Sequence, residues 1–201
     1  MSLALIFHLI FVFAYAGMLV IRIAYHRKAK RARRDTQLHE GVPNLLARAV
    51  IGIGYITFLM LYAFSPGWFA WSSFQLPAGL RWLGAGLSLG SVALLWWIQS
   101  ALDVQFNTNL HTQAGHRLIQ HGPYRWVRHP MYTNFILMGA GWLLLTANWL
   151  VGVPLMLAIL LIVAVRVRRE EALMIAVFGE AYRQYMQRSG RFLPRWRAKS
   201  S

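Results

Sequence analysis

Five apolar runs separated by basic segments constrain the fold of this chain more than any other feature. The runs cover residues 3–21, 45–64, 82–102, 132–146 and 149–165. A helix needs about 20 residues, within a range of about 17 to 25, to cross the hydrocarbon core of a bilayer. The first three runs meet this length, and flanking amphipathic residues can complete the two shorter ones. The sequence therefore predicts an all-α, polytopic membrane bundle with about five transmembrane helices.

The composition agrees with a chain that is largely surrounded by lipid. Hydrophobic residues make up 57% of the sequence and charged residues 13%, whereas a soluble domain carries about 25% charged residues. Cysteine is absent, which excludes disulfides and thiolate metal sites. A net charge of +15 can indicate nucleic-acid binding, but here the charges lie between the apolar runs. This segregation favours the lipid bilayer, with its anionic headgroups, over nucleic acid as the partner.

The positions of lysine and arginine predict the orientation of the bundle. The chain has 21 of these residues, and all but Arg81 fall in segments 22–48, 103–131 and 166–201. With five spans and the N-terminus outside, all three segments lie on the cytosolic side, as the positive-inside rule requires. We therefore expect an N-out, C-in protein of a bacterial inner membrane or an endoplasmic reticulum membrane. The first run has no basic segment before it and no clear cleavage site, so we expect a retained helix rather than a signal peptide.

Local signals suggest how the chain is organised. We expect a single membrane domain over residues 1–201, with a three-helix part at 1–105 and a cofactor-binding and catalytic part at 106–201. Only Ala147-Asn148 separates the last two runs, which predicts a tight helical hairpin. A residue before proline is displaced from the helical region, so His129 marks a helix boundary and Pro130 fits the first turn of the fourth helix. We expect Gly179 and its neighbours to end or kink the tail helix.

The inner segment 111–132 combines histidines, tyrosines and arginines with two X-Pro turns. Its four histidines are spaced by 5, 5 and 8 residues, with no carboxylate or cysteine among them, so we expect no metal site. A loop that only adheres to lipid needs charge alone, which leaves the aromatic residues and the turns unexplained. In the tail, Arg166 and Glu170 share a helix face. Such a pair is either an ordinary surface ion pair or part of a binding site for a polar ligand.

These motifs resemble those of the isoprenylcysteine carboxyl methyltransferase family. The likeness covers about the C-terminal half of the chain, from Phe106 to Pro194, and the first two spans carry no matching motif. It lies in the loop at His116-Arg117-Leu118-Ile119, Gly122-Pro123-Tyr124 and Arg128-His129-Pro130-Met131-Tyr132, and in the tail at Arg166, Glu170-Glu171, Phe178-Gly179-Glu180 and Tyr182. The resemblance implies a membrane bundle whose fourth and fifth helices form a hairpin beside a cytosolic cofactor pocket.

The resemblance also implies methyl transfer from S-adenosylmethionine to a hydrophobic or lipid-linked acceptor, and it assigns roles to individual residues. The implied cofactor-binding residues are His116, Arg117, Leu118, Ile119, Tyr124, His129, Tyr132 and Glu170. Arg166 matches a residue tied to the acceptor carboxylate, and Glu171 is the second catalytic candidate. A carboxylate acceptor is ionised at neutral pH and needs no general base. An amine acceptor would have to lose a proton, for which His129 or Glu171 would be the base.

Two other functions remain open at this point. One is N-methylation of a phospholipid headgroup or another amine, because phospholipid N-methyltransferases have a similar membrane architecture. The other is a non-catalytic role in membrane assembly or transport, with the fold retained. Cofactor binding separates the enzyme from the non-catalytic protein, and the base lability of a methyl ester separates carboxylate from amine chemistry. The sequence leaves the oligomeric state open.

Overall fold

The computed structural model describes residues 2–32, 42–102 and 118–195. Its helices are α1 (Leu3–Ala32), α2 (Val42–Phe64), α3 (Ala78–Leu102), α4 (Pro130–Thr146), α5 (Trp149–Phe178) and α6 (Glu180–Arg188), with short 3-10 helices η1 (Pro66–Ser72) and η3 (Gly122–Arg125). Within these ranges extended pairing is limited to two isolated bridges. The predicted all-α class is confirmed.

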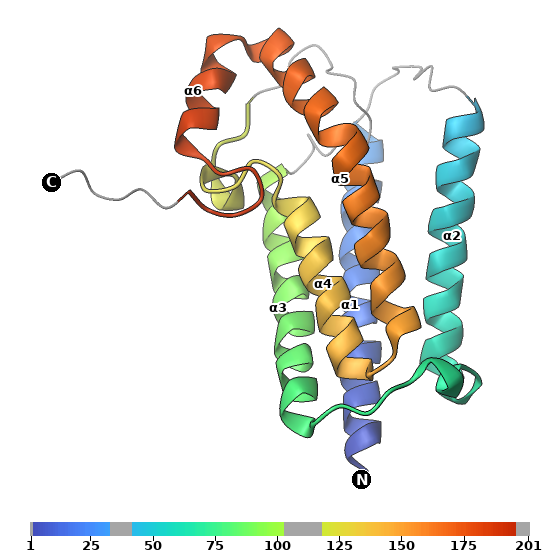
Figure 1. The fold of residues 1–201 in the computed structure, drawn as a ribbon. Coiled ribbons are helices and arrows are strands. Elements are labelled where there is room, and N and C mark those ends of the chain that lie inside the picture. The colour runs from blue at the N-terminus through green and yellow to red at the C-terminus, as the bar shows by residue number, and fades with distance from the viewer. Residues whose placement is uncertain (1, 33–41, 103–117, 196–201) are drawn as a thin grey trace, which may run out of the picture.

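Helices α1 to α5 run alongside one another, and α6 turns away at the end opposite the N-terminus (Figure 1). Segments of 26, 25 and 30 residues in α1, α3 and α5 are long and apolar enough to cross a membrane. The end of α2 and η1, bent by 106° at their junction, form a fourth candidate if they are counted as one span. Helix α4 has 17 residues, at the lower end of the spanning range. The chain is an integral membrane protein, and its helix number is roughly that expected.

Close contacts at glycine fix α4 between α3 and α5. A Cβ atom on Gly84 of α3 would overlap the backbone of Leu145 in α4. A Cβ atom on Gly152 of α5 would overlap the carbonyl oxygen of Gly139 in α4. Small residues at such points let helix backbones approach closely, which favours helix association in lipid. These contacts hold the middle and the end of α4 close to α5 and α3.

An aromatic cluster joins the N-terminal helices to α4. The ring of Phe11 in α1 lies 5.2 Å from Tyr62 of α2 and 5.7 Å from Trp142 of α4, both edge to face. Phe7, Phe11 and Trp142 are almost completely buried. Edge-to-face pairs of this kind add to the dispersion gained by burial. The cluster anchors α1 and α2 against the helix that begins at the candidate site.

The turn between α4 and α5 is held by one asparagine. Ala147 adopts the left-handed conformation with φ of 50°, and Asn148 caps α5 by accepting a 3.1 Å hydrogen bond from the backbone N–H of Leu150. The Asn148 side chain also accepts a hydrogen bond from Ser72 and donates one to the carbonyl of Phe69. The predicted hairpin at Ala147-Asn148 is confirmed. The same side chain attaches η1 to the hairpin.

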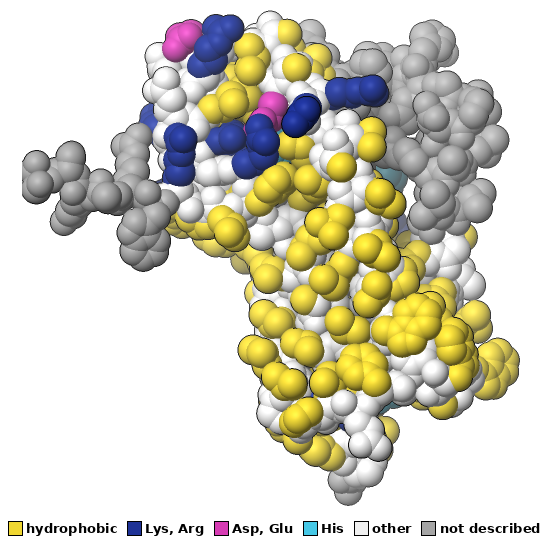
Figure 2. Space-filling view, in the orientation of Figure 1, with side chains coloured by type: hydrophobic (Ala, Val, Ile, Leu, Met, Phe, Trp, Pro, Cys, Tyr) yellow, Lys and Arg dark blue, Asp and Glu magenta, His cyan; other side chains and the backbone are white. Residues whose placement is uncertain are grey.

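Helix α5 extends well beyond the apolar run that ends at Val165 and stops only at Phe178. Many residues after Val165, including Arg, Glu, Ala, Leu and Met, favour helix, so the change in polarity marks a boundary of the apolar zone without ending the helix. The predicted break at Gly179 is confirmed: its φ is 52°, a conformation that glycine adopts readily, and α6 follows at once. Figure 2 shows Lys and Arg gathered near α6, with hydrophobic side chains over much of the rest of that face.

Candidate active site

The candidate site forms where the first turn of α4 meets the polar part of α5. His129 is the N-cap residue of α4, and Pro130 occupies the first helical position, as the sequence predicts. Proline lacks a backbone N–H, and at the first position of a helix this group would have no partner within the helix, so Pro130 costs no hydrogen bond there. His129 and Tyr132 therefore project from the rigid start of a helix toward α5.

Glu170 is the centre of a half-buried polar cluster, here called the Glu170 cluster, which also contains His129, Tyr132 and Arg166. The hydroxyl of Tyr132 donates a 2.8 Å hydrogen bond to Oε1 of Glu170. Nε of Arg166, one helical turn away, lies 3.4 Å from the same oxygen. Nδ1 of His129 lies 3.7 Å from the other oxygen, Oε2. The structure thus brings together four of the predicted site residues from two helices.

Glu171 is more deeply buried than Glu170 and has different partners. Nε of Arg128 lies 3.0 Å from its Oε1, and Arg191 contacts both carboxylate oxygens through Nε and one terminal nitrogen. Paired guanidinium–carboxylate contacts are strong and directional. The arrangement favours a positioning role for Glu171, because a carboxylate held by two guanidinium groups is a poor proton acceptor. Its assignment as a catalytic residue stays a prediction.

Residues 189–192, here called the C-terminal strap, lie across the segment that precedes α4. The backbone N–H groups of Arg128 and His129 donate to the carbonyls of Gly190 and Arg191 at 2.8 and 3.0 Å. Thr133 Oγ1 donates to the carbonyl of Phe192 at 2.7 Å. These hydrogen bonds pair backbone groups near the helix start that would otherwise have no hydrogen-bond partner. The strap thereby fixes the position of His129.

Burial lowers the pKa of His129 below its usual 6.5, because an imidazolium would lose its hydration there. The Glu170 and Glu171 carboxylates offset part of this effect, and Arg128 opposes them. His129 is therefore neutral at neutral pH, with one ring nitrogen protonated and the other an acceptor. Its buried Nε2 makes no hydrogen bond within the described part of the chain and lies 3.5 Å from Glu171.

The other predicted cofactor residues are only partly placed. Leu118 and Ile119 are half-buried in non-helical chain before η3, while His116 and Arg117 lie outside the described residues. Tyr124 is in η3, and its carbonyl accepts a 2.6 Å hydrogen bond from Tyr185 of α6. Burial raises the pKa of Tyr124. It also raises the pKa of Tyr185, to about 12. The contact with α6 places Tyr124 beside the C-terminal part of the chain, and its role toward a cofactor stays a prediction.

Sequence reasoning did not assign roles to Arg128 or Arg191. Arg128 directly precedes the predicted boundary residue His129, so its position in the motif was a usable signal. Its side chain is 8% exposed and contacts Glu171 together with the carbonyls of Met186 and Ser189. Arg191 lies in a short stretch after α6 whose sequence gave no indication of a contact with α5. Both residues support the Glu170 cluster by holding the neighbouring Glu171 in place.

The model of the isoprenylcysteine carboxyl methyltransferase (ICMT) family matches residues 84–176, which include His129, Tyr132, Arg166 and both glutamates. This segment of the chain is similar to the isoprenylcysteine carboxyl methyltransferase family. A probable protein-S-isoprenylcysteine O-methyltransferase of Oryza sativa subsp. indica is 33% identical over 85 residues, which are 42% of this chain and 44% of the relative. The protein-S-isoprenylcysteine O-methyltransferase of Schizosaccharomyces pombe is 29% identical over 107 residues, 50% of this chain and 45% of the relative.

A solved structure of the family has the same arrangement of helices. The eukaryotic intramembrane Ras methyltransferase superposes with a TM-score of 0.55 over 91% of this chain and 62% of its own, at 23% identity. This likeness establishes a shared fold. The chain spans less than half the length of the two curated relatives. The similarity to this family and the shared fold therefore point to a class of function without identifying the acceptor.

Proposed function

We propose that this chain is an integral-membrane methyltransferase that uses S-adenosylmethionine to O-methylate a carboxylate on a hydrophobic or lipid-linked acceptor. The observation that carries the proposal is the Glu170 cluster, in which Tyr132, His129 and Arg166 surround one carboxylate. The cluster lies within the segment that matches the family. Both relatives described above are named as isoprenylcysteine O-methyltransferases.

The donors and acceptors of the cluster fit S-adenosylmethionine. This molecule, when bound, supplies a methyl group on a positively charged sulfur, together with an ammonium group and ribose hydroxyls. The Glu170 carboxylate can accept hydrogen bonds from such cationic or hydroxyl groups. The buried Nε2 of His129 has no hydrogen-bond partner among the described residues, and a buried polar atom of this kind is costly unless a ligand or water pairs with it. Glu170, His129 and Tyr132 are therefore the residues proposed to hold the cofactor.

Arg166 is proposed to position the acceptor. Its side chain is 26% exposed and its guanidinium lies beside Glu170, so it can reach a ligand while staying attached to the cluster. An arginine fork can orient a carboxylate through two parallel hydrogen bonds. The carboxylate needs no general base because it is already ionised. Alignment of the reactants and exclusion of water are then the main contributions that the protein makes.

The predicted topology gives this chemistry a suitable location. The Glu170 cluster joins the first turn of α4 to the polar part of α5, and α6, which follows α5, lies at the end of the bundle opposite the N-terminus (Figure 1). Lysine and arginine outside the apolar runs are concentrated in segments that the positive-inside rule assigns to the cytosol. A polar cofactor would reach the cluster from the cytosol, and an apolar acceptor would reach it from the bilayer. The proposal holds for a bacterial inner membrane and for an endoplasmic reticulum membrane.

Calorimetric titration of S-adenosylmethionine into detergent-purified protein tests the cofactor site. We expect the wild type to bind, and we expect Glu170→Gln and His129→Ala each to weaken binding by about tenfold, because each removes a strong polar contact. Glu180→Gln is the matched control, since Glu180 is exposed and pairs only loosely with Arg183 at 3.6 Å. Absence of binding by folded wild-type protein with an acceptor-like lipid present would contradict the proposal and favour the non-catalytic alternative.

A further inference from the structure

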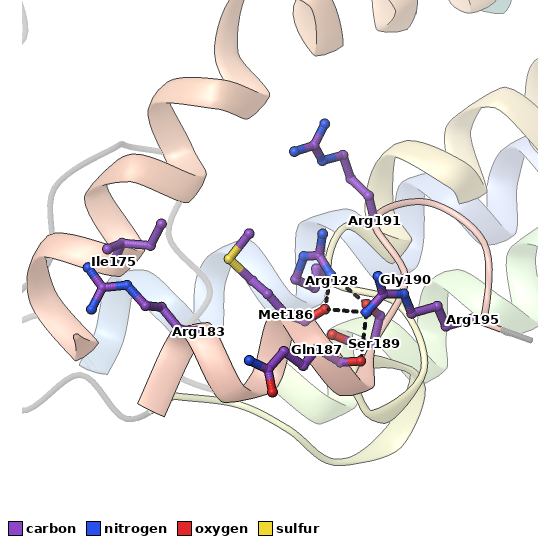
Figure 3. A pocket seen from close by; sticks show the side chains of 9 residues that line it. All are labelled: Arg128, Ile175, Arg183, Met186, Gln187, Ser189, Gly190, Arg191 and Arg195. Atoms are coloured by element: carbon purple, nitrogen blue, oxygen red, sulfur yellow. Dashed lines mark hydrogen bonds between the residues drawn. The ribbon is translucent and has the colours of Figure 1, made fainter. Parts of the chain in front are cut away.

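A cavity of about 640 Å³ lies between the end of α5, α6 and the chain that follows α6. Four arginines line it, namely Arg128, Arg183, Arg191 and Arg195 (Figure 3). The residues of the Glu170 cluster are not part of its lining. Glu171 lies between the two regions, because it contacts Arg128 and Arg191 and also approaches His129. The cavity is therefore a separate space next to the candidate active site.

The cavity walls carry an excess of positive charge. In the part of the chain that the structure describes, two carboxylates form ion pairs with three of its four arginines. Glu171 pairs with Arg128 and Arg191, and Glu180 lies 3.6 Å from Arg183. The latter pair is more than half exposed on both sides, so it is weak and easily exchanged. Among the described residues, the four guanidinium charges thus exceed the carboxylates paired with them by two.

The backbone around the cavity holds one of these guanidinium groups in place. One terminal nitrogen of Arg195 donates hydrogen bonds to the carbonyls of Met186 and Gln187, at 3.3 and 2.7 Å. The carbonyls at the end of a helix carry partial negative charge, which stabilises a nearby cation. The other guanidinium nitrogens of Arg195 have no hydrogen bond to described residues. The guanidinium of Arg195 is therefore already held beside the cavity, so an anion that binds there would cost little further side-chain entropy.

The cavity also lies at a suitable height relative to the membrane. It follows directly on the polar end of α5, at the end of the molecule where Lys and Arg gather (Figure 2). Trp97 at the end of α3 contacts Trp126 beside η3, with ring centroids 5.7 Å apart. Tryptophans are enriched at the level of lipid headgroups, so this pair marks the boundary near the cavity. A headgroup phosphate would lie at about this level.

We propose that this arginine-lined cavity binds a phosphate group, and that an anionic phospholipid of the surrounding membrane supplies it. Phosphate oxygens accept the paired hydrogen bonds that guanidinium groups donate, and basic pockets at the cytosolic boundary of membrane proteins are suited to such headgroups. The site is distinct from the proposed methyl-transfer site and does not depend on that function.

Native mass spectrometry of the whole chain tests the proposal. The protein is released from micelles that contain equal amounts of phosphatidylglycerol and phosphatidylcholine, and the retained lipids are counted. We expect the wild type to retain phosphatidylglycerol preferentially. Arg183→Gln should reduce that preference by about fivefold, and Arg183→Gln combined with Arg195→Gln should reduce it further by a similar factor. The single variant loses only an exposed ion pair, which guards against misfolding as the cause.

The matched control is Arg168→Gln combined with Arg169→Gln. Both residues are exposed on α5 and do not line the cavity, so the change in net charge is the same as in the cavity double variant. Retention in this control should stay within about twofold of the wild type. Equal losses in the two double variants would overturn the proposal, because they would show that only overall charge attracts the lipid.

Inorganic phosphate separates a lipid source from a soluble one. A thermal shift is measured for lipid-free protein in phosphate and in chloride of equal ionic strength. Stabilisation by phosphate that is lost in Arg183→Gln, without any lipid preference, would assign the site to a soluble phosphate compound. Neither lipid preference nor stabilisation would overturn the proposal. The two readouts involve no S-adenosylmethionine, so they remain valid if methyl transfer is disproved.

Discussion

Tyr132 and Glu170 are 38 residues apart in the chain, and the hydroxyl of Tyr132 donates a 2.8 Å hydrogen bond to Oε1 of Glu170. This contact joins the first turn of α4 to the polar part of α5. It also occupies one oxygen of Glu170 and leaves the other, Oε2, oriented toward His129 at 3.7 Å. The orientation of Glu170, whose carboxylate is proposed to hold the cofactor, therefore depends on a tyrosine from a different helix.

Tyr132→Phe should weaken S-adenosylmethionine binding more than it affects stability. Removal of a hydrogen bond to a charged group costs about 1.5 kcal/mol, which corresponds to about tenfold in affinity if Glu170 loses its orientation. Calorimetric titration measures this change. Tyr15→Phe is the control, because Tyr15 donates an equally short hydrogen bond to Ile56 in the remote part of the bundle. An equal loss of affinity in both variants would contradict the role given to Tyr132.

Arg128 and Arg191 both contact Glu171, but their loss should differ in cost. Arg128 is 8% exposed and Arg191 is 46% exposed. We expect Arg128→Gln to lower the free energy of unfolding by about 3 to 5 kcal/mol, because it leaves a buried carboxylate with a poorer partner. Arg191→Gln should cost about 1 kcal/mol or less, since water can replace its contact. Denaturant unfolding in detergent measures both, and equal costs would be inconsistent with the burial difference.

Asn148→Ala should open the turn between α4 and α5. The substitution removes the cap of α5 and leaves the Phe69 carbonyl without the hydrogen bond that Nδ2 donates. Together these losses should lower stability by about 2 to 3 kcal/mol. Asn148→Asp retains the cap acceptor but buries a carboxylate whose second oxygen faces the Phe69 carbonyl, so it should cost more than Asn148→Ala. The thermal unfolding midpoints of the two variants check this order, and the reverse order would contradict it.

The lowered pKa of His129 predicts that acid destabilises the protein. The unfolded chain binds a proton near pH 6.5, whereas folded His129 resists protonation because of burial. Its contribution is therefore complete above pH 6.5 and is lost as the pH falls below that value. The unfolding temperature should fall between about pH 7.5 and about pH 5.5 in the wild type. His129→Gln should show a smaller fall, and an identical profile would count against the assignment.

Local features of the fold could be predicted from the sequence. The boundary at His129-Pro130, the hairpin at Ala147-Asn148 and the break at Gly179 are all present. Each depends on the backbone preferences of one or two adjacent residues or on the length of an apolar run. Such signals are visible without knowledge of the tertiary contacts.

The partners of Glu171 could not be predicted in the same way. Arg128 is 43 residues before it and Arg191 is 20 residues after it. A chain with 21 lysine and arginine residues offers many candidate partners for each carboxylate, and spacing favours a particular pair only within a helix, as with Arg166 and Glu170. The contacts made by the C-terminal strap require the three-dimensional course of α5 and α6. For this reason sequence reasoning found the Glu170 cluster but not its supporting frame.

Transfer of a labelled methyl group tests the central claim most directly. Bilayer-reconstituted protein is given methyl-labelled S-adenosylmethionine and an isoprenylated cysteine with a free carboxylate. We predict a labelled product that releases methanol in base, and we predict that Arg166→Gln lowers its formation by about tenfold or more while Arg168→Gln has little effect. A base-stable product would contradict carboxylate methylation and indicate an amine acceptor, and no product from protein that binds the cofactor would contradict this acceptor class.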